Sequence, residues 1–146
     1  NSLTPQQQAV CDPDFVAQAR LGQAFSALQI QQLHLRRGAL GSHMRQFMQG
    51  YDLIVTPATA VAAFDALPAG HGVMTPETML GWTPFSYPFN LTQQPACTVP
   101  CGFTAAGLPI GLQLVGPMFA DALVLRVANA FETARNIPTL APTTEP

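Results

Sequence analysis

Lysine is absent from this chain of 146 residues, whose positive side chains are all arginine. Charged residues make up 10% of the sequence, well below the roughly one-quarter that is usual for a soluble globular protein. The net charge is −2 and there is no basic run, so the chain lacks the positive surface that binds nucleic acid. We therefore expect no nucleic-acid partner, and we expect part of this weakly charged surface to be covered.

Long apolar runs are also missing. None reaches the roughly 18 residues that a membrane-spanning helix needs, and the start NSLTPQQQ lacks the basic flank and apolar core of a signal peptide. The sequence therefore predicts no membrane association and a cytoplasmic location. Cys97 and Cys101, if they share a strand, lie about 13 Å apart, too far for a disulfide. Free thiols are expected, which also fits a reducing cytoplasm.

The histidines and cysteines are not spaced as in a metal site or a catalytic nucleophile–base pair. His34 and His43 stand nine positions apart on one predicted helix, which places them on opposite faces. Cys97 and Cys101 have neither the usual two-residue spacing of a zinc site nor a second ligand pair. We predict no metal site and no cofactor. His71 is interpreted as a solvated loop residue rather than as the base of a catalytic cysteine.

Two helices are predicted in the first third of the chain. Asp12-Pro13-Asp14 begins a short helix that ends near Gly22, because Asp is a good cap and Pro a good first residue. Ser26 and Gln29 have capping-box spacing ahead of a long helix that reaches about Gln49. One apolar stripe on this helix is expected to face a core, and two glycines within it indicate close packing. The stripe is Leu33, Leu40, Met44, Phe47 and Tyr51, and the glycines are Gly38 and Gly41.

Strands and helices then alternate, which predicts the α/β class. Residues 51–57 form a short β-branched run that predicts a fully buried strand. From 58 to 88 periodicity disappears among many Pro and Gly residues, as in a lid or binding loop. Residues 96–103 and 109–115 predict two strands joined by a turn at 104–107. A helix begins at Asp121 and ends at Asn136, before a Pro/Thr-rich tail at 137–146.

Five sequence pieces carry a family resemblance. The pieces PFNLT, QPACTVPCGF, GLPIGLQLVGP and DALVLRVANAFE, with YDLIVTPAT upstream, together closely resemble the C-terminal region of the amidase signature hydrolases. The resemblance covers nearly the whole chain. It implies that residues 1–136 are the C-terminal portion of an amidase signature domain, an α/β/α fold with a mixed β-sheet flanked by helices. Residues 58–88 are then a loop that borders the substrate pocket.

The same resemblance implies a reaction whose catalytic groups are missing here. Members of the family cleave amides through an acyl-enzyme that uses a Ser, a second Ser in a cis peptide and a Lys. This chain has no Lys and no Ser-Ser pair, and Arg, always charged, cannot replace the Lys base. No catalytic residue is therefore assigned. We expect a C-terminal fragment of an amidase, inactive alone, whose partners are the upstream part of the enzyme and a small-molecule amide substrate. The alternative is a non-catalytic binding or assembly module derived from that fold.

Residues on the substrate side can be carried over. The resemblance implies that Trp82, Thr83, Phe85 and Phe89 border the acyl pocket, although the aromatic ones could equally cap the core. Glutamine-using members have an acidic residue at the position of Thr83, so the neutral Thr favours a neutral or aromatic acyl group over glutamine.

Three further expectations concern single positions and the strand edges. Gln94 stands where the family usually has Gly, and its side chain is expected to alter the local turn. Gln113 is interpreted as a buried side chain bonded to backbone rather than a ligand contact. Strands such as Leu53 to Thr56 and Ala96 to Cys101 are expected to lack the sheet neighbours that the rest of the enzyme supplies, which predicts self-association through exposed edges.

Overall fold

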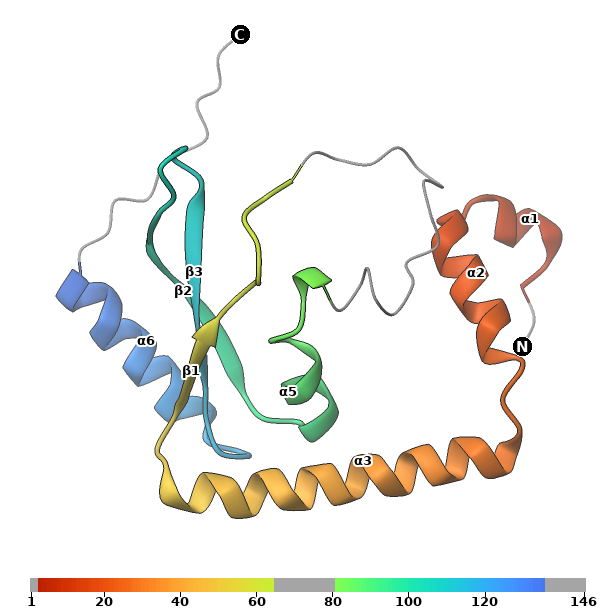
Figure 1. Ribbon diagram of the computed structural model, residues 1–146, viewed down its shortest axis with the longest axis horizontal. Coiled ribbons are helices and arrows are strands. Elements are labelled where there is room, and N and C mark those ends of the chain that lie inside the picture. The colour runs from red at the N-terminus through yellow and green to blue at the C-terminus, as the bar shows by residue number, and fades with distance from the viewer. Residues whose placement is uncertain (1–2, 65–80, 136–146) are drawn as a thin grey trace, which may run out of the picture.

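The computed structural model describes residues 3–64 and 81–135 (Figure 1). Helices and a small sheet are combined, as the predicted α/β class requires. The predicted tail at 137–146 and the middle of the predicted loop at 58–88 lie outside the described residues. The elements in chain order are α1 (Pro5–Ala9), α2 (Pro13–Gly22), α3 (Ala27–Phe47), the 3-10 helix η1 (Met48–Gly50), β1 (Ile54–Pro57), α5 (Tyr87–Thr92), β2 (Ala96–Phe103), β3 (Pro109–Val115) and α6 (Asp121–Arg135).

Side-chain caps begin the two predicted N-terminal helices. The Asp12 carboxylate accepts hydrogen bonds from the N–H groups of Asp14 (2.8 Å) and Phe15 (3.2 Å), which begins α2. At α3, Ser26 Oγ accepts from the Gln29 N–H at 3.3 Å and Gln29 Oε1 accepts from the Ser26 N–H at 2.8 Å. Each cap contributes about 1 kcal/mol by satisfying N–H groups that have no partner within the helix. Both predicted helix starts are confirmed.

The prediction that the apolar stripe of α3 faces a core is wrong for the described residues. Leu33, Phe47 and Tyr51 are about half exposed, and Leu40 is also exposed. In Figure 1, α3 runs as one long rod below the other elements, and it packs against α5 and η1. The close packing expected at Gly38 is absent as well, because no atom lies within 4 Å of a β-carbon built there. Met44, the remaining residue of the stripe, is half-buried.

The sheet is antiparallel throughout the described residues, with β3 between β1 and β2. The predicted pair of strands at 96–103 and 109–115 is confirmed with its turn. The first strand was predicted from its local sequence to be fully buried, but it forms an edge of the described sheet, where Val55 is 55% exposed. This open edge agrees with the expectation that the strand has lost sheet neighbours. Its β-branched residues indicate a strand correctly, but burial depends on neighbours that local sequence does not reveal.

The hydrophobic core lies between α6 and one face of the sheet. Val99 and Leu114 from the strands meet Val124 and Ala128 from α6, and all four are buried. Gly116 allows this approach, since a β-carbon there would lie 2.6 Å from Val124 Cγ2. Figure 1 shows α6 on the outer side of the sheet and α5 on the other side, toward α3.

Candidate functional site

The sheet face opposite α6 carries a polar row. Thr56 of β1 and Thr98 of β2 are both paired with Gln113 of β3, so the three residues lie side by side across the sheet. Alternation along β3 places Gln113 on the face opposite Leu114, which belongs to the α6 core. Gly111 lies on the same face as Gln113, where a β-carbon would come within 2.8 Å of Thr98 Cγ2. This polar face is therefore closely packed around the centre of β3.

Gln113 joins this face to the segment that precedes α5. Its Nε2 donates hydrogen bonds to Thr56 Oγ1 and to the Phe85 carbonyl oxygen, both at 2.9 Å. The Gln113 side chain is 8% exposed, so both bonds are shielded from water. The interpretation of Gln113 as a buried residue bonded to backbone is confirmed.

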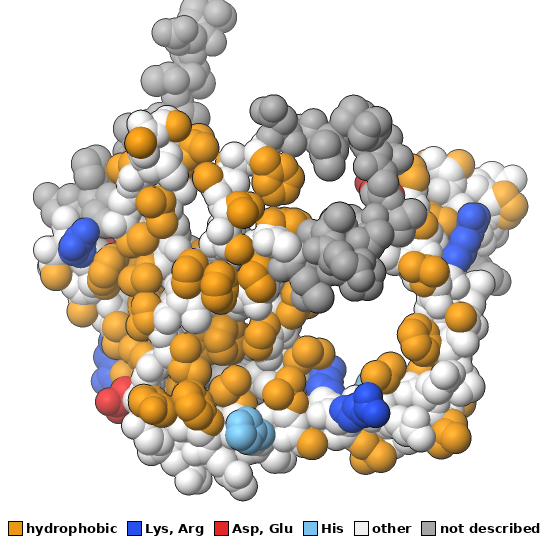
Figure 2. All heavy atoms as spheres, in the orientation of Figure 1, with side chains coloured by type: hydrophobic (Ala, Val, Ile, Leu, Met, Phe, Trp, Pro, Cys, Tyr) orange, Lys and Arg blue, Asp and Glu red, His pale blue; other side chains and the backbone are white. Residues whose placement is uncertain are grey.

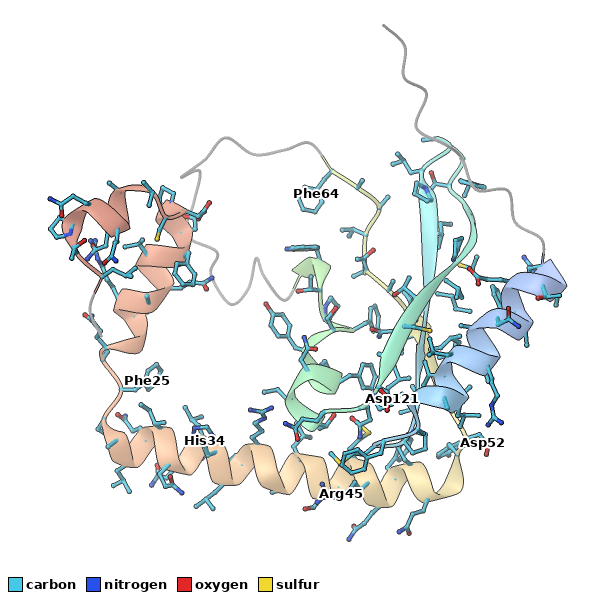
Figure 3. The ribbon with its side chains drawn as sticks, turned by 180° about the vertical axis from the view of Figure 1, so that it is seen from behind. Phe25, His34, Arg45, Asp52, Phe64 and Asp121 are labelled. Carbon is cyan, nitrogen blue, oxygen red and sulfur yellow. The ribbon has the colours of Figure 1, made fainter. Side chains whose placement is uncertain are left out.

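Residues 81–92, here called the wall segment, contain all four predicted substrate-binding residues. Trp82 is 37% exposed, Thr83 and Phe85 are half-buried, and Phe89 in α5 is buried. The Trp82 ring meets the Phe64 ring edge-on, with centroids 6.0 Å apart, and Figure 3 labels Phe64. The Trp82 carbonyl accepts a hydrogen bond from the Ala60 N–H at 3.2 Å. The structure thus brings the four residues together on one segment, with Phe89 the deepest.

Helix α5, like the short helix α1, is an element that the sequence prediction missed. Pro88 was interpreted as a loop signal, yet it lies in the first turn of the helix, where a missing N–H costs nothing. The helix ends at Gln93, whose backbone is left-handed (φ 64°) and whose N–H donates to the Phe89 carbonyl at 2.7 Å. The special turn position is therefore Gln93, and the expectation that assigned it to Gln94 was one residue off. Gln94 is buried and contacts the Thr92 hydroxyl through its Oε1.

Helix α3 holds the C-terminal end of the wall segment. Arg37 Nε donates to the Leu91 carbonyl at 2.9 Å, and Arg37 Nη2 donates to the Asn90 carbonyl at 3.4 Å. A positive charge at the end of a helix is favourable because the last carbonyls there have no helical partner. A cleft of about 250 Å³ lies beside this contact, and His34 and Arg45, both labelled in Figure 3, line it together with Arg37. The arginines of LHLRRGAL fit the family resemblance, but the sequence alone assigned Arg37 no contact or role.

The described residues show no metal cluster, and their cysteines are unpaired. No group of three His, Cys, Asp or Glu side chains that could hold a metal ion occurs among them. The three cysteines are free, and burial, with a smaller contribution from Glu132, raises the pKa of the Cys97 thiol. A thiol with a raised pKa is a poor nucleophile at neutral pH, because the thiolate is the reactive form. No helix in residues 3–64 or 81–135 is long and apolar enough to cross a bilayer.

Comparison with known proteins assigns the family. The family model described as Amidase matches residues 12–125. The acylamidase of Rhodococcus erythropolis is 42% identical over 103 residues, covering 68% of this chain and 21% of that protein. A glutamyl-tRNA(Gln) amidotransferase subunit from Bacillus thuringiensis (strain Al Hakam) is 43% identical over 89 residues, covering 61% of this chain and 18% of that protein.

Solved structures agree on the fold. A 6-aminohexanoate cyclic dimer hydrolase complexed with substrate superposes with a TM-score of 0.79 at 19% identity, over 97% of this chain and 31% of that chain. The corresponding glutamyl-tRNA(Gln) amidotransferase subunit from Thermotoga maritima gives 0.64 at 27% identity, over 91% of this chain and 28% of that chain. The chain thus spans about a fifth of the curated relatives (18–21%) and under a third of these solved chains (28–31%). With the family match covering well over half of its residues, the chain belongs to the amidase signature family.

Proposed function

We propose that this chain is the C-terminal portion of an amidase that hydrolyses a carboxylic amide to an acid and ammonia or an amine. The reaction proceeds through an acyl-enzyme formed by a Ser–cisSer–Lys triad, which sequence outside this chain supplies. One observation carries the proposal: the family match extends over residues 12–125, while the whole sequence contains neither a Lys nor a Ser-Ser pair. In that triad a neutral Lys amine is the base that takes the proton of the nucleophile through the second Ser, and a permanently charged Arg cannot replace it.

Within that enzyme, the chain supplies sheet strands and one wall of the acyl pocket. The wall consists of Trp82, Thr83, Phe85 and Phe89, which share the wall segment. Two features support this role: Trp82 remains 37% exposed although it is large and aromatic, and the segment is tied to the polar face of the sheet through Gln113. Aromatic side chains with one exposed face are suited to hold an apolar or aromatic acyl group.

The substrate is an amide with a neutral or aromatic acyl group. Thr83 carries no charge, so it cannot pair with the amino group of glutamine, whereas a neutral acyl group avoids burying an unpaired charge. The relatives include both an acylamidase and a glutamyl-tRNA(Gln) amidotransferase subunit, so family membership alone leaves this choice open. The side chain at position 83 is what favours the first of these two substrate classes.

A chimera tests the proposal. Residues 12–125 replace the matching segment of the Rhodococcus erythropolis acylamidase, and hydrolysis of simple aromatic and aliphatic amides is measured. The chimera is expected to hydrolyse them, while the isolated chain and a chimera whose catalytic Lys is changed to Ala are expected to be inactive. Turnover by the isolated chain would overturn the proposal. A folded chimera without hydrolysis would favour the alternative, a non-catalytic binding or assembly module.

A further inference from the structure

We propose that Gln113 is a positioning residue for the acyl pocket: its hydrogen bond to the Phe85 carbonyl fixes the wall segment, and with it Thr83 and Trp82, against the sheet. This inference rests on the proposed function, because it assigns the wall segment to substrate binding. The new element is the role of Gln113, which is buried and is not one of the four residues proposed to border the pocket.

The geometry of Gln113 suits this role. A side-chain amide nitrogen has two hydrogens, and here one is donated to Thr56 Oγ1 in β1 and the other to the Phe85 carbonyl, both at 2.9 Å. The first bond fixes the plane of the amide, so the second hydrogen points in a defined direction. Gln113 is 8% exposed, and in such surroundings a carbonyl left without a donor is destabilising because water cannot replace the lost bond.

The support behind Gln113 is rigid. Strand β3 is paired on both sides, and Leu114 and Val115, which follow Gln113, are 2% and 0% exposed. A central strand whose residues are buried opens at a higher free energy than a segment with few buried contacts. Because the Gln113 side chain joins β3 to the wall segment, the position of the strand determines where the wall segment lies.

Phe85 connects the Gln113 contact to Thr83, because both residues belong to one turn. The Ser86 N–H donates to the Thr83 carbonyl at 3.1 Å, which closes a turn around Thr83 to Ser86. Phe85 lies inside this turn, so a shift of its carbonyl moves Thr83, the residue that we assign to acyl selectivity. Arg37 holds the other end of the wall segment, five and six residues after Phe85, so it does not replace the contact made by Gln113.

The chain contains its own reporter, because Trp82 is its single tryptophan. Gln113→Met keeps the length of the side chain and removes both donors. We expect it to shift Trp82 emission and to make the ring more accessible to acrylamide, as the segment leaves the sheet and the Phe64 contact loosens. Gln113→Glu is the conservative variant: the single O–H of its protonated carboxyl can donate to the Phe85 carbonyl while its other oxygen accepts from the Thr56 hydroxyl, whereas its ionised form repels the Phe85 carbonyl.

Gln113→Glu should therefore behave like the unmodified chain in acid and like Gln113→Met at higher pH. Burial and the hydrogen bond donated to Phe85 both favour the neutral carboxyl, so the transition is expected above the ordinary Glu pKa of about 4.3. Thr56 and Thr98, the β1 and β2 residues paired with position 113, do not titrate. The unmodified chain, measured over the same pH range, accounts for ionisable groups elsewhere.

Val99→Ala is the matched structural control. It removes buried volume on the α6 face of the same sheet and should lower the unfolding midpoint without changing Trp82 emission at any pH. A Trp82 signal in Gln113→Glu that does not respond to pH beyond the unmodified chain overturns the proposal. So does a Gln113→Met signal identical to that of the unmodified chain.

The chimera supplies an independent measurement on the reaction. There Gln113→Met is expected to raise KM for a neutral aromatic amide about tenfold, with kcat changed less than about threefold, because the wall contacts the acyl group and not the reacting atoms. A loss confined to kcat would contradict the positioning role. If every chimera is inactive, the proposed function fails, while the Trp82 measurement still decides whether Gln113 fixes the wall segment.

Discussion

At the residue scale, Gln93 holds an unusual backbone conformation at the end of α5. Its φ of 64° lies in the left-handed region, where a β-carbon costs about 1–2 kcal/mol and glycine has no such penalty. We predict that Gln93→Gly raises the free energy of unfolding by about 1 kcal/mol, since the greater freedom of glycine in the unfolded chain offsets part of the gain. Urea denaturation followed by circular dichroism measures the change.

Gln23 offers the matched control for that substitution. It ends α2 as Gln93 ends α5, but its backbone is right-handed (φ −67°), so the β-carbon there carries no strain. Gln23→Gly is expected to lower the free energy of unfolding by about 0.5–1 kcal/mol, because only the entropic cost of glycine remains. Equal effects at the two positions would show that the conformation of Gln93 is not strained.

Thr83 allows a second prediction for a single residue, in the chimera described above. Thr83→Glu places a carboxylate beside the acyl group, and a neutral group leaves that charge partly desolvated and unpaired. We expect kcat/KM for a neutral aromatic amide to fall about tenfold, equivalent to about 1.4 kcal/mol. Amides that carry an amino group on the acyl side should lose less. Thr83→Val, similar in shape and uncharged, is the control. A tenfold loss of kcat/KM in this variant too would show that the charge of the carboxylate is not the cause.

At the element scale, the three strands meet closely at Gly111. A β-carbon there would lie 2.8 Å from Thr98 Cγ2 in β2 and 2.9 Å from Ala58 Cβ just after β1. Gly111→Ala is predicted to lower the free energy of unfolding by about 1–3 kcal/mol through overpacking. Gly38→Ala provides the opposite case, because the space around it is open and alanine is the better helix former by up to about 1 kcal/mol. Thermal unfolding of both variants tests the pair, and a stable Gly111→Ala chain would contradict it.

Local sequence was sufficient for elements whose signals are local. The strands at 96–103 and 109–115, the turn between them and the caps at Asp12 and Ser26 were all predicted because adjacent residues determine them. Helix α5 was missed because proline is common both in loops and in the first turn of a helix, so Pro88 alone does not distinguish the two. The pairing of β1 with β3 depends on distant residues, so local sequence could not give it. The open edge at β1 was expected only because the family resemblance indicated missing sheet neighbours.

In the candidate site, too, local sequence indicated some features but not the contacts between distant residues. A glutamine in an otherwise apolar strand indicated that Gln113 has a bonded role, but its partners Thr56 and Phe85 lie 57 and 28 residues away. No periodicity encodes contacts of that separation. The four wall residues came from the family resemblance, whose pieces are continuous in sequence and therefore visible before the fold is known.

At the scale of the whole molecule, much apolar surface remains uncovered. Among the described residues, twenty-one large hydrophobic side chains are exposed, whereas seven hydrophobic side chains are buried. Figure 2 shows hydrophobic side chains spread over the part of this face that holds the sheet, with few charges among them. A surface of this kind is typical of an interface, because soluble monomers rarely expose large continuous apolar patches.

The isolated chain is therefore predicted to self-associate. Strands β1 and β2 form the two edges of the described sheet, and an edge strand with unpaired N–H and C=O groups pairs readily with another copy. Size-exclusion chromatography with light scattering should show species larger than a monomer, in proportions that grow with concentration. Val55→Lys places a charge on the exposed edge of β1 and is expected to shift the population toward monomer. Val10→Lys, at an even more exposed position next to α1 and away from the sheet, should leave it unchanged. A monomer at every concentration, or equal effects of the two substitutions, would mean that the β1 edge does not drive association.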